Sequence, residues 1–380
     1  MKILYILKHN PWGIGGGCYA CRNYMDAFID VFHGADFDLC ICEEYLKDRG
    51  TDYPENVRFI GVKPRTIVEK ILSPISGILH RHQKMAKEMI KHGRYDYCLF
   101  DHNSIAGSLV RICKKNDVKT IVLNHNCEQE YFRDNNSRTK KYLLLTTVRK
   151  NEKKSYQECT YNIFLTKEDE LTFNKLYGHS NTKSVVGGCF FKKGEEINVN
   201  ENKEYNKERL KIVISGTMGN VQNLDGINYF LDELYPMLPD NIDVVMTGKN
   251  PPDSLIEKVE PYSNIEIIAN PENILDIVEQ CDIFLCPTRL GGGMKLRLMD
   301  GFRLGLFVLS HEVSARGYDY FVNSGALRVF TDVTSFRSEL STLIDIIRRG
   351  SVKKVDIVRD ATKYFDYNRN LERLDIFING

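Results

Sequence analysis

The sequence has almost no net charge and no long apolar run. Its 380 residues include 52 Lys and Arg against 51 Asp and Glu, which gives a formal charge of +1. This balance excludes an electrostatic attraction of the whole chain to nucleic acid and leaves only local fields. No apolar stretch approaches the roughly 18 residues that a membrane span needs, and the apolar part of Met1–His9 is too short for a signal peptide. We therefore expect a cytoplasmic protein.

Recognisable metal and redox motifs are also scarce. The 11 cysteines are scattered through apolar segments such as Leu39–Cys42, which favours reduced, buried thiols. Cys18 and Cys21 have the spacing of a zinc or redox pair, but no second pair of cysteines or histidines stands at ligand distance from them. Structural thiols are therefore the favoured interpretation.

Short β-type runs alternate with helical periodicity along the chain, as in parallel α/β domains. Strands are expected at residues 2–7, 37–42, 57–62, 97–101, 120–124 and 162–165, and again at 211–215, 242–247, 264–268, 283–286, 307–309 and 326–330. The sequence thus predicts an α/β protein with two doubly wound, Rossmann-like sheets. We place the first domain at 1–190, a polar linker at 191–209, the second domain at 210–354 and a charged helix at 355–380.

The first glycine-rich turn, Gly13–Cys18, follows the first expected strand. Glycines at such a turn let backbone N–H groups approach a phosphate or a sugar at the positive end of a helix. Cys18 stands where the third glycine of the dinucleotide fingerprint would be, so NAD binding is not expected. A ligand-lined loop and a tight structural turn both stay open.

The second glycine-rich turn, Gly291–Gly293, follows a buried strand that ends at Pro287. We expect these glycines to open a helix with Lys295 in its first turn. A cation opposes the helix dipole there unless an anion is bound, so this local conflict indicates a functional site. Asp300, further along the same helix, could accept hydrogen bonds from a ribose diol; a solvated helix carboxylate is the alternative.

Two further turns follow the first two strands of the second half, at Ser215–Asn220 and Thr247–Pro252. The carboxyl ends of parallel strands lie at one edge of a sheet, and ligands of such folds bind there. Lys249 in the second turn is either an anion ligand or a surface lysine.

Together these motifs resemble the retaining, nucleotide-sugar-dependent glycosyltransferases with two Rossmann-like domains, the GT-B fold, and among them family 4. The most specific match is 291–310, which is similar to the family's Gly-x-Lys-x-x-x-Leu-Glu-Ala-Met and Gly-x-Pro-Val-Val segments. The resemblance covers nearly the whole chain and includes Ser215–Thr217, Asn223–Gly226, His125–Glu128, Leu165–Asp169 and Phe365–Tyr367.

The resemblance implies a UDP- or GDP-sugar held mainly by the second domain and a glycan or lipid-linked acceptor held mainly by the first. It also implies that the last helix packs back on the first domain. The implied catalytic residues are His125, Lys249 and Lys295. The implied donor-binding residues are Gly16, Gly17, Gly216, Thr217, Asn270, Ile274, Gly292, Gly293, Met294 and Asp300. Because lysines and backbone N–H groups would neutralise the diphosphate, we expect no metal and no cofactor.

One departure from the family pattern bears on activity. The family often has two glutamates eight positions apart, and Gly292 and Asp300 stand at those positions. The missing first carboxylate favours an alternative, a non-catalytic homologue that serves as a partner subunit or glycan-binding module. The retained Lys249, Lys295 and Asp300 favour the enzyme. An epimerase of the same fold would need further catalytic carboxylates.

Two segments of the first half are strongly basic. Residues 63–94 and 133–154 each contain eight Lys and Arg and two acidic residues, which leaves a charge of −11 for the rest of the chain. We expect a helical stretch over 67–91 in the first segment. Ile67, Ile71, Ile75 and Ile78 recur there at helical intervals, which are broken near Pro74 and Gly77. An amphipathic basic helix can lie on an anionic membrane, which would make the protein peripheral and its acceptor lipid-linked. A helix whose apolar face is turned to the core is the alternative.

Overall fold

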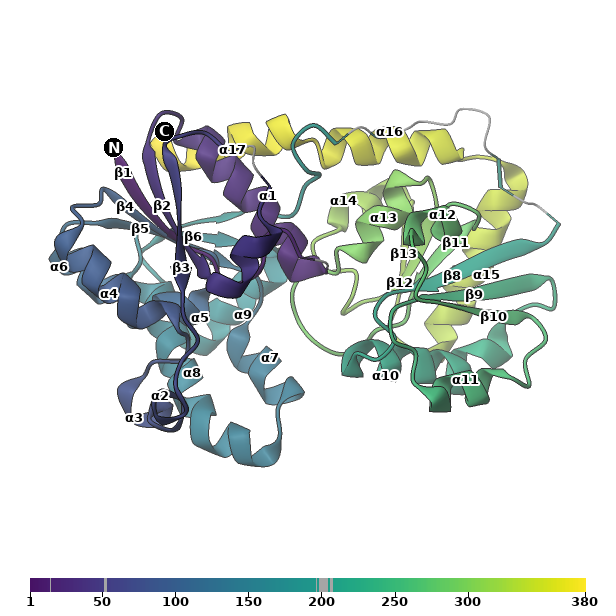
Figure 1. The fold of residues 1–380 in the computed structure, drawn as a ribbon. Helices are drawn as coiled ribbons and strands as arrows, with labels where there is room; N and C mark the ends of the chain where they lie inside the picture. The colour runs from purple at the N-terminus through teal and green to yellow at the C-terminus, as the bar shows by residue number, and fades with distance from the viewer. Residues whose placement is uncertain (14, 51–52, 196, 198–203, 206–207) are drawn as a thin grey trace. The chain divides into compact units, whose positions relative to one another are not determined.

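The chain forms two compact units, each built around its own sheet (Figure 1). The computed structural model describes residues 1–13, 15–50, 53–195, 197, 204–205 and 208–380. Unit 1 comprises Met1–Gly194, Gly292–Met294 and Tyr367–Gly380, and unit 2 comprises Glu195–Gly291 and Lys295–Asp366. Residues 196, 198–203 and 206–207 of the expected linker lie outside the described residues.

Unit 1 contains a seven-stranded parallel sheet with the order β3-β2-β1-β4-β5-β6-β7. Its strands are β1 (Lys2–Ile6), β2 (Asp36–Cys42), β3 (Val57–Val62), β4 (Tyr97–Phe100), β5 (Lys119–Asn124), β6 (Tyr161–Phe164) and β7 (Lys183–Val186). The first six are the strands expected from the sequence, whereas β7 was not expected. That short edge strand begins with exposed Lys183 and Ser184, so it lacks the apolar run of a central strand.

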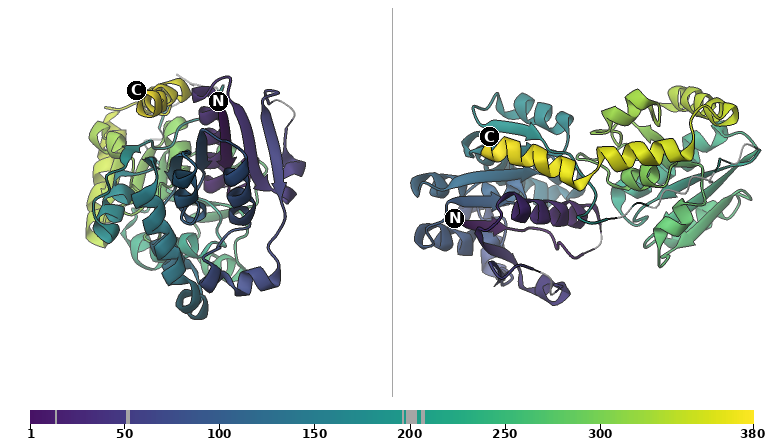
Figure 2. Two further views of the ribbon diagram at one scale, coloured as in Figure 1. Left: turned by 90° about the vertical axis from the view of Figure 1, so that its left-hand side faces the viewer. Right: turned by 90° about the horizontal axis from the view of Figure 1, so that it is seen from above.

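Helices cover both faces of this sheet (Figures 1 and 2). They are α1 (Gly16–Val31), α2 (Ile67–Ile71), α3 (Ser73–Ser76), α4 (His82–His92), α5 (Asn103–Ala106), α6 (Val110–Lys115), α7 (Glu128–Asn135), α8 (Arg138–Glu158), α9 (Lys167–Tyr177) and α17 (Tyr367–Asn379), with a 3-10 turn at Glu43–Asp48. Successive side chains of a strand point to opposite faces. In β1, Leu4 and Ile6 join the apolar cluster under α4, α5 and α6, whereas the ring of Tyr5 meets Phe28 of α1 at 5.6 Å.

Unit 2 contains a six-stranded parallel sheet with the order β10-β9-β8-β11-β12-β13. Its strands, all expected from the sequence, are β8 (Leu210–Ser215), β9 (Ile242–Gly248), β10 (Ile265–Ala269), β11 (Ile283–Cys286), β12 (Phe307–His311) and β13 (Leu327–Phe330). Its helices are α10 (Val221–Tyr229), continued by a π turn at Phe230–Leu234 and a 3-10 turn at Tyr235–Met237, α11 (Asp253–Val259), α12 (Ile274–Val278), α13 (Arg297–Arg303), α14 (Asp319–Ser324), α15 (Val333–Arg349) and α16 (Lys354–Tyr364).

The C-terminal segment, expected as one helix over 355–380, forms two helices. The first, α16, ends at Tyr364, and the next residue, Phe365, is fully buried against Phe321, with ring centroids 5.3 Å apart. The second helix, α17, belongs to unit 1, where it lies beside α1 (Figure 2). Its Tyr367 hydroxyl donates to Asp30 of α1 at 2.8 Å.

In each sheet the strand order reverses next to the first strand, between β1 and β4 in unit 1 and between β8 and β11 in unit 2. The connections on either side of such a switch point leave toward opposite faces, and a crevice opens at the carboxyl ends of the strands. The fold therefore predicts one ligand-binding edge in each unit.

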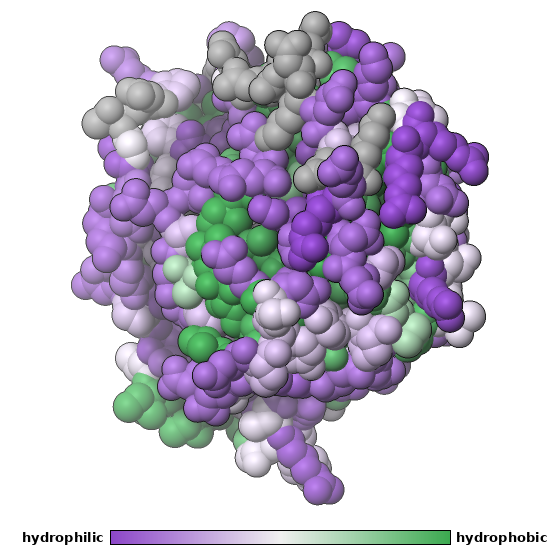
Figure 3. Space-filling view, turned by 90° about the vertical axis from the view of Figure 1, so that its right-hand side faces the viewer, coloured by the Kyte–Doolittle hydropathy of each residue, from purple (hydrophilic) through white to green (hydrophobic). Residues whose placement is uncertain are grey.

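No described helix combines the length and the apolar character that a membrane crossing requires. The molecular face shown in Figure 3 is mostly hydrophilic, and its apolar side chains gather in small patches.

Candidate functional site

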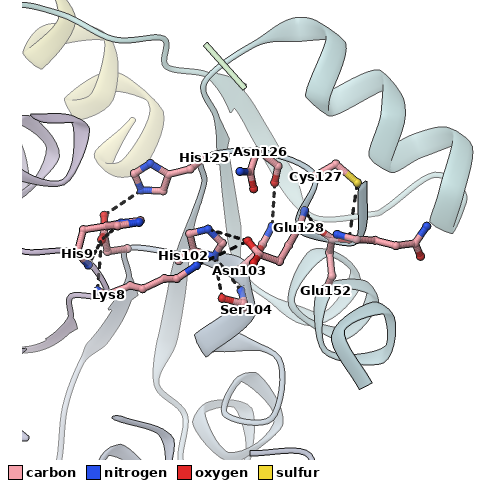
Figure 4. A network of polar contacts seen from close by, with 12 residues as sticks. Lys8, His9, His102, Asn103, Ser104, His125, Asn126, Cys127, Glu128 and Glu152 are labelled. Carbon is pink, nitrogen blue, oxygen red and sulfur yellow. Dashed lines mark hydrogen bonds and ion pairs between the residues drawn. The ribbon is translucent and has the colours of Figure 1, made fainter. Parts of the chain in front are cut away.

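Three histidines meet at the switch point of unit 1 (Figure 4). His9 follows β1, His102 follows β4 and His125 follows β5. The ring of His125 lies 5.4 Å from that of His9 and is stacked on that of His102 at 5.5 Å. Of the three, the sequence predicts only His125 as a site residue, because His9 and His102 come beside it only through the order in which the strands pair.

Asp101, the first residue after β4, is fully buried beneath these rings. Its Oδ1 lies 3.0 Å from Nε2 of His125, and its Oδ2 accepts hydrogen bonds from the backbone N–H groups of Lys8 and His9. Burial alone would raise the pKa of Asp101, but the contacts with His125 and His9 hold it well below its usual range. An ionised carboxylate only accepts hydrogen bonds, so Nε2 of His125 carries a proton, and in the neutral imidazole Nδ1 is then the acceptor.

His102 forms a second buried pair with Glu128, the first residue of α7. Its Nε2 lies 3.0 Å from Oε2 of Glu128, while its Nδ1 accepts from the N–H of Ser104 at 3.3 Å. Burial lowers the pKa of His102 to about 3, and the nearby Lys8 ammonium acts in the same direction. Burial favours neutral Glu128, but Lys8 and His102 hold the pKa of Glu128 well below its usual range. The pair is therefore a neutral imidazole beside a carboxylate.

Glu152 of α8 fixes the start of α7. Its carboxylate accepts from the backbone N–H groups of Glu128 at 2.5 Å and Gln129 at 3.2 Å, and from the Tyr177 hydroxyl at 2.5 Å. Burial raises the pKa of Glu152 to about 7, although these hydrogen bonds oppose the shift. Because Glu152 holds the first turn of α7, it also sets the position of Glu128. No local sequence signal indicates this role, since the two residues are brought together only by tertiary packing.

His102 and Glu152 should give opposite pH dependences of stability. The pKa of His102 is lowered from 6.5 to about 3, so between those values the unfolded chain binds a proton at His102 that the folded protein does not. The free energy of unfolding therefore decreases as the pH falls through this window. The pKa of Glu152 is raised from 4.5 to about 7, so between those values the folded protein binds a proton at Glu152 that the unfolded chain does not. The free energy of unfolding therefore decreases as the pH rises through this window. Each group changes the free energy of unfolding by at most about 1.4 kcal/mol per pH unit. Urea unfolding between pH 5 and 6.5 should therefore show a more negative slope of stability against pH for His102→Gln than for wild type, and a more positive slope for Glu152→Gln. Three parallel curves would contradict these assignments.

Gly16 and Gly17, which the resemblance implies as donor-binding residues, lie beside His9. Helix α1 begins at Gly16, after Gly15 at a φ of 122°, and a Cβ on Gly17 would stand 3.1 Å from the His9 ring. That contact is tighter than a side chain normally accepts, so glycine lets the helix N-terminus approach the ring closely. The structure thus brings Gly16 and Gly17 to the same edge of unit 1 as His125.

The edge of unit 2 collects the turns after β8, β9 and β10. Gly216 and Gly248 have φ angles of 143° and 149°, and a Cβ on Gly248 would overlap the carbonyl oxygen of Gly216. Exposed Asn270 accepts from the N–H of Asn250 at 3.0 Å and so ties the turns after β9 and β10 together. The predicted Gly216, Thr217, Lys249, Asn270 and Ile274 all lie on these turns, with Lys249 exposed and Ile274 opening α12.

Arg297, the first residue of α13, occupies the switch point of unit 2. Its guanidinium donates to Asn223 at 2.7 Å and to Thr288 at 2.5 Å, and its Nε is buried without a hydrogen-bond partner among the described residues. It borders a cavity of about 10 Å³, room for one water, together with Ser215 and Gly216. Arg297 lies inside the motif quoted from the sequence, but it was not predicted as a site residue because a helical arginine is usually a surface residue.

The expected position of Lys295 in the first turn of a helix is wrong. Helix α13 begins two residues later, because Gly291 and Gly293 adopt φ angles of 88° and 71° that keep the chain out of a helix. Nζ of Lys295 donates to Gln222 of α10 at 3.3 Å, and its carbonyl accepts from the Tyr318 hydroxyl at 2.9 Å. Lys295 nevertheless belongs to the edge of unit 2, whereas Gly292, Gly293 and Met294 group with unit 1.

Asp300 lies in the first turn of α13 with 37% of its side chain exposed. Burial raises its pKa to about 6, although Arg303, at 3.9 Å, favours the ionised form. It can accept a hydrogen bond in its ionised form, so its assignment to the ribose stays a prediction.

The family match falls almost entirely within unit 2, whereas the structural matches extend over both units. Residues 209–345 match the family described as Glycosyl transferases group 1. No curated protein matches the chain in sequence.

Solved structures match over both units. HepE from Anabaena, crystallised with UDP and glucose, has a TM-score of 0.65 and 11% identity and covers 100% of this chain and 99% of its own. Sucrose-phosphate synthase from Thermosynechococcus elongatus has a TM-score of 0.70 and 10% identity over 98% and 97% of the two chains. The pneumococcal O-GlcNAc transferase GtfA, crystallised with UDP and GlcNAc, has a TM-score of 0.63 and 12% identity over 100% and 98%. The protein therefore has the predicted GT-B fold, and residues 209–345 match glycosyl transferases of group 1.

Proposed function

We propose that the protein is a glycosyltransferase of family 4 that transfers a sugar from a UDP- or GDP-sugar to a glycan or glycolipid, with retention of configuration and without a metal. The observation that carries the proposal is the edge of unit 2 within the matched residues 209–345. Gly216 and Arg297 line the switch point there, and Lys295 donates to Gln222 of α10. The presence of UDP in the HepE and GtfA structures supports a nucleotide-sugar donor.

The chemistry of sugar transfer fits these groups. When the sugar leaves, negative charge develops on the diphosphate, and preorganised cations and N–H groups lower the barrier. Lys295 and Arg297 lie at this edge, and Lys249 adds a cation after β9. These three positive charges support a metal-independent reaction. In unit 1, the Asp101–His125 pair leaves an imidazole nitrogen to meet the acceptor hydroxyl.

A panel of nucleoside diphosphates tests the proposal. We expect UDP or GDP to raise the melting temperature of the full chain, because ligands that bind only the folded state stabilise it by mass action. Release of the free nucleotide from the matching sugar donor, and the anomeric configuration of the product, then test transfer and retention. An unchanged melting temperature with every nucleotide would favour the alternative, a non-catalytic homologue, which the glycine at position 292 also favours.

The surface of unit 1 supports a lipid-linked acceptor and an anionic membrane as a partner. Ile67, Ile71 and Ile75 are 75%, 70% and 87% exposed, so they do not form the core-facing stripe of the alternative. The basic segment 63–94, expected as helical over 67–91, is divided into α2, α3 and α4, and Gly77 ends α3 with a φ of 70°. Exposed apolar residues flanked by cations are typical of surfaces that insert into anionic lipid.

The two basic segments meet in the structure. Asn151 of α8 donates to the carbonyl of Gly77 at 3.0 Å, and Tyr142, on the same helix, is 88% exposed. The first basic segment lines a cavity of about 880 Å³, large enough for part of a lipid, which includes Ser76 and Ile78 on either side of Gly77. Its lining includes Val62, Pro64, Leu72, Ile78, Met85, Lys63, Arg65 and Lys84. This combination supports synthesis of a surface glycan or glycolipid at the inner face of a membrane, in a cytoplasm that keeps the eleven free cysteines reduced.

Vesicle sedimentation tests the membrane contact. We expect the protein to sediment with anionic vesicles more than with neutral ones, and the double variant Ile71→Ser and Ile75→Ser to lose most of this binding. Ile376→Ser on α17, at 71% exposure, is the matched control and should bind as wild type does. Equal sedimentation with anionic and neutral vesicles would rule out the membrane contact.

A further inference from the structure

We propose that His9, Asp101 and His125 form a zinc site in unit 1, and that a bound zinc ion switches off sugar transfer. The three side chains come from three strand ends and place one ligand atom each within 4.8 Å of the others. Nε2 of His125 lies 3.0 Å from Oδ1 of Asp101, and Nδ1 of His9 lies 3.5 Å from Oδ2. Two imidazoles and one carboxylate are a ligand set that zinc takes readily.

The spacing suits a tetrahedral ion. With bonds of about 2.0–2.1 Å, the ligand atoms of tetrahedral zinc stand roughly 3.3–3.4 Å apart. The two separations above run to different oxygens of Asp101, and with one ligand atom from each residue all three lie within 4.8 Å. Side-chain rotations would therefore have to bring the three atoms to the tetrahedral spacing. Three protein ligands leave the fourth position for water, as in zinc sites that are not purely structural.

The site is also preorganised. Asp101 is fully buried, and its orientation is fixed by the backbone N–H groups of Lys8 and His9. Nδ1 of His9 is a buried nitrogen without a hydrogen-bond partner among the described residues, and Gly17 packs against the opposite side of that ring. The Lys8 ammonium, which follows the same strand as His9, pairs with Glu128 at 3.7 Å. An ionised buried carboxylate between two imidazoles therefore offers a cation both charge and ligands.

His9 provides the route of entry. Its side chain is 29% exposed, whereas that of His125 is 8% exposed and that of Asp101 is fully covered. Because Nδ1 of His9 is itself buried, the partly exposed ring has to turn to meet an ion from solvent, which can then replace the contact between Asp101 and His125.

The effect on transfer follows from the tautomer of His125 and rests on the proposed function. Without zinc, Nε2 holds the proton and Nδ1 can accept the proton of an acceptor hydroxyl. Zinc binds an unprotonated nitrogen, so the proton moves from Nε2 to Nδ1, and Nδ1 becomes a donor. The imidazole keeps its single proton, but it no longer has a lone pair for the acceptor hydroxyl. Zinc should therefore inhibit transfer reversibly.

Zinc titration of the full chain, with a chromogenic chelator as competitor, tests binding without any need for activity. We expect one zinc ion per chain, bound on the order of a hundredfold more weakly by His9→Gln and by Asp101→Asn, since each removes a ligand. His33→Gln, at an exposed histidine, is the matched control and should bind as wild type does. Cobalt substitution should give the visible absorption of a tetrahedral site without a thiolate charge-transfer band.

Several outcomes would overturn the site. They are no zinc binding by the wild type, equal affinity in wild type and His9→Gln, or loss of binding in Cys18→Ser, which would indicate a thiol ligand. Circular dichroism of each variant identifies a failure to fold, and the partly exposed His9 is the safer of the two ligand substitutions.

Inhibition is tested separately, by comparing each protein with its own zinc-free rate. Zinc should slow wild-type transfer, EDTA should restore it, and His9→Gln should be much less sensitive. Zinc that binds at the site without slowing transfer would overturn the regulatory half of the proposal. If no zinc-free protein transfers sugar, the proposed function fails while the zinc titration still decides the site.

Discussion

Replacing Lys295 by alanine is expected to lower the rate of sugar transfer by about a hundredfold or more, because removal of one preorganised group that meets the developing charge typically costs about 3 kcal/mol. Lys295 stands just ahead of α13, within reach of Gln222 at the edge of unit 2. The same variant should also lose the rise in melting temperature that UDP or GDP gives, since the lysine would hold the diphosphate in the ground state. Nucleotide release under saturating acceptor measures the rate.

Lys258→Ala is the matched control for this prediction. Lys258 also belongs to unit 2, but its ammonium pairs with Asp232 at 2.6 Å. We expect it to keep wild-type transfer and wild-type stabilisation by nucleotide. Equal losses in both variants would show that the effect of Lys295 is a general consequence of removing positive charge from unit 2. A normal rate in Lys295→Ala would remove this lysine from the mechanism.

Replacing His125 by alanine should lower transfer by roughly a hundredfold or more, the usual contribution of a positioned acid–base group. In contrast to Lys295→Ala, it should leave nucleotide stabilisation in place, because His125 belongs to unit 1 and the nucleotide is proposed to bind unit 2. The pair of variants thus separates loss of chemistry from loss of donor binding. Single-turnover assays with excess enzyme, together with melting curves with and without UDP, measure both effects.

His92→Ala serves as the control for His125, since His92 is a 78% exposed histidine of the same unit. It should behave as wild type in both measurements. If His125→Ala also lost nucleotide stabilisation while folding normally, the division of labour between the two units would be wrong.

The strands were predictable because both faces of each sheet are covered. A strand that is buried on both sides reads as a continuous apolar run, such as Ile3–Leu7 or Ile283–Cys286. The missed strand, β7, lies at the sheet edge and is half exposed, so its sequence carries no such run. The helical stretch predicted over 67–91 is interrupted at the break expected near Pro74 and Gly77, because Gly77 takes a left-handed conformation that ends α3.

The candidate site was only partly predictable. Residues that follow strands, such as His125 and Gly216, could be placed at a ligand edge because parallel strands end together. The pairing of His125 with Asp101, however, depends on which strands are neighbours, and β1 lies between β2 and β4 in the sheet. Glu152 supports α7 from a different helix, and its role depends on tertiary packing that periodicity does not encode.

The place of α17 has a consequence for how the protein is made. This helix completes unit 1 through contacts of Tyr367 with Asp30 and of Phe377 with Tyr161, whose rings lie 5.5 Å apart. During translation, residues 1–194 leave the ribosome before the whole of unit 2, but the helix that covers α1 and β6 emerges only after it. The surface of unit 1 that α17 covers therefore stays exposed while unit 2 is synthesised. During this time the nascent chain can aggregate or bind chaperones through that apolar surface.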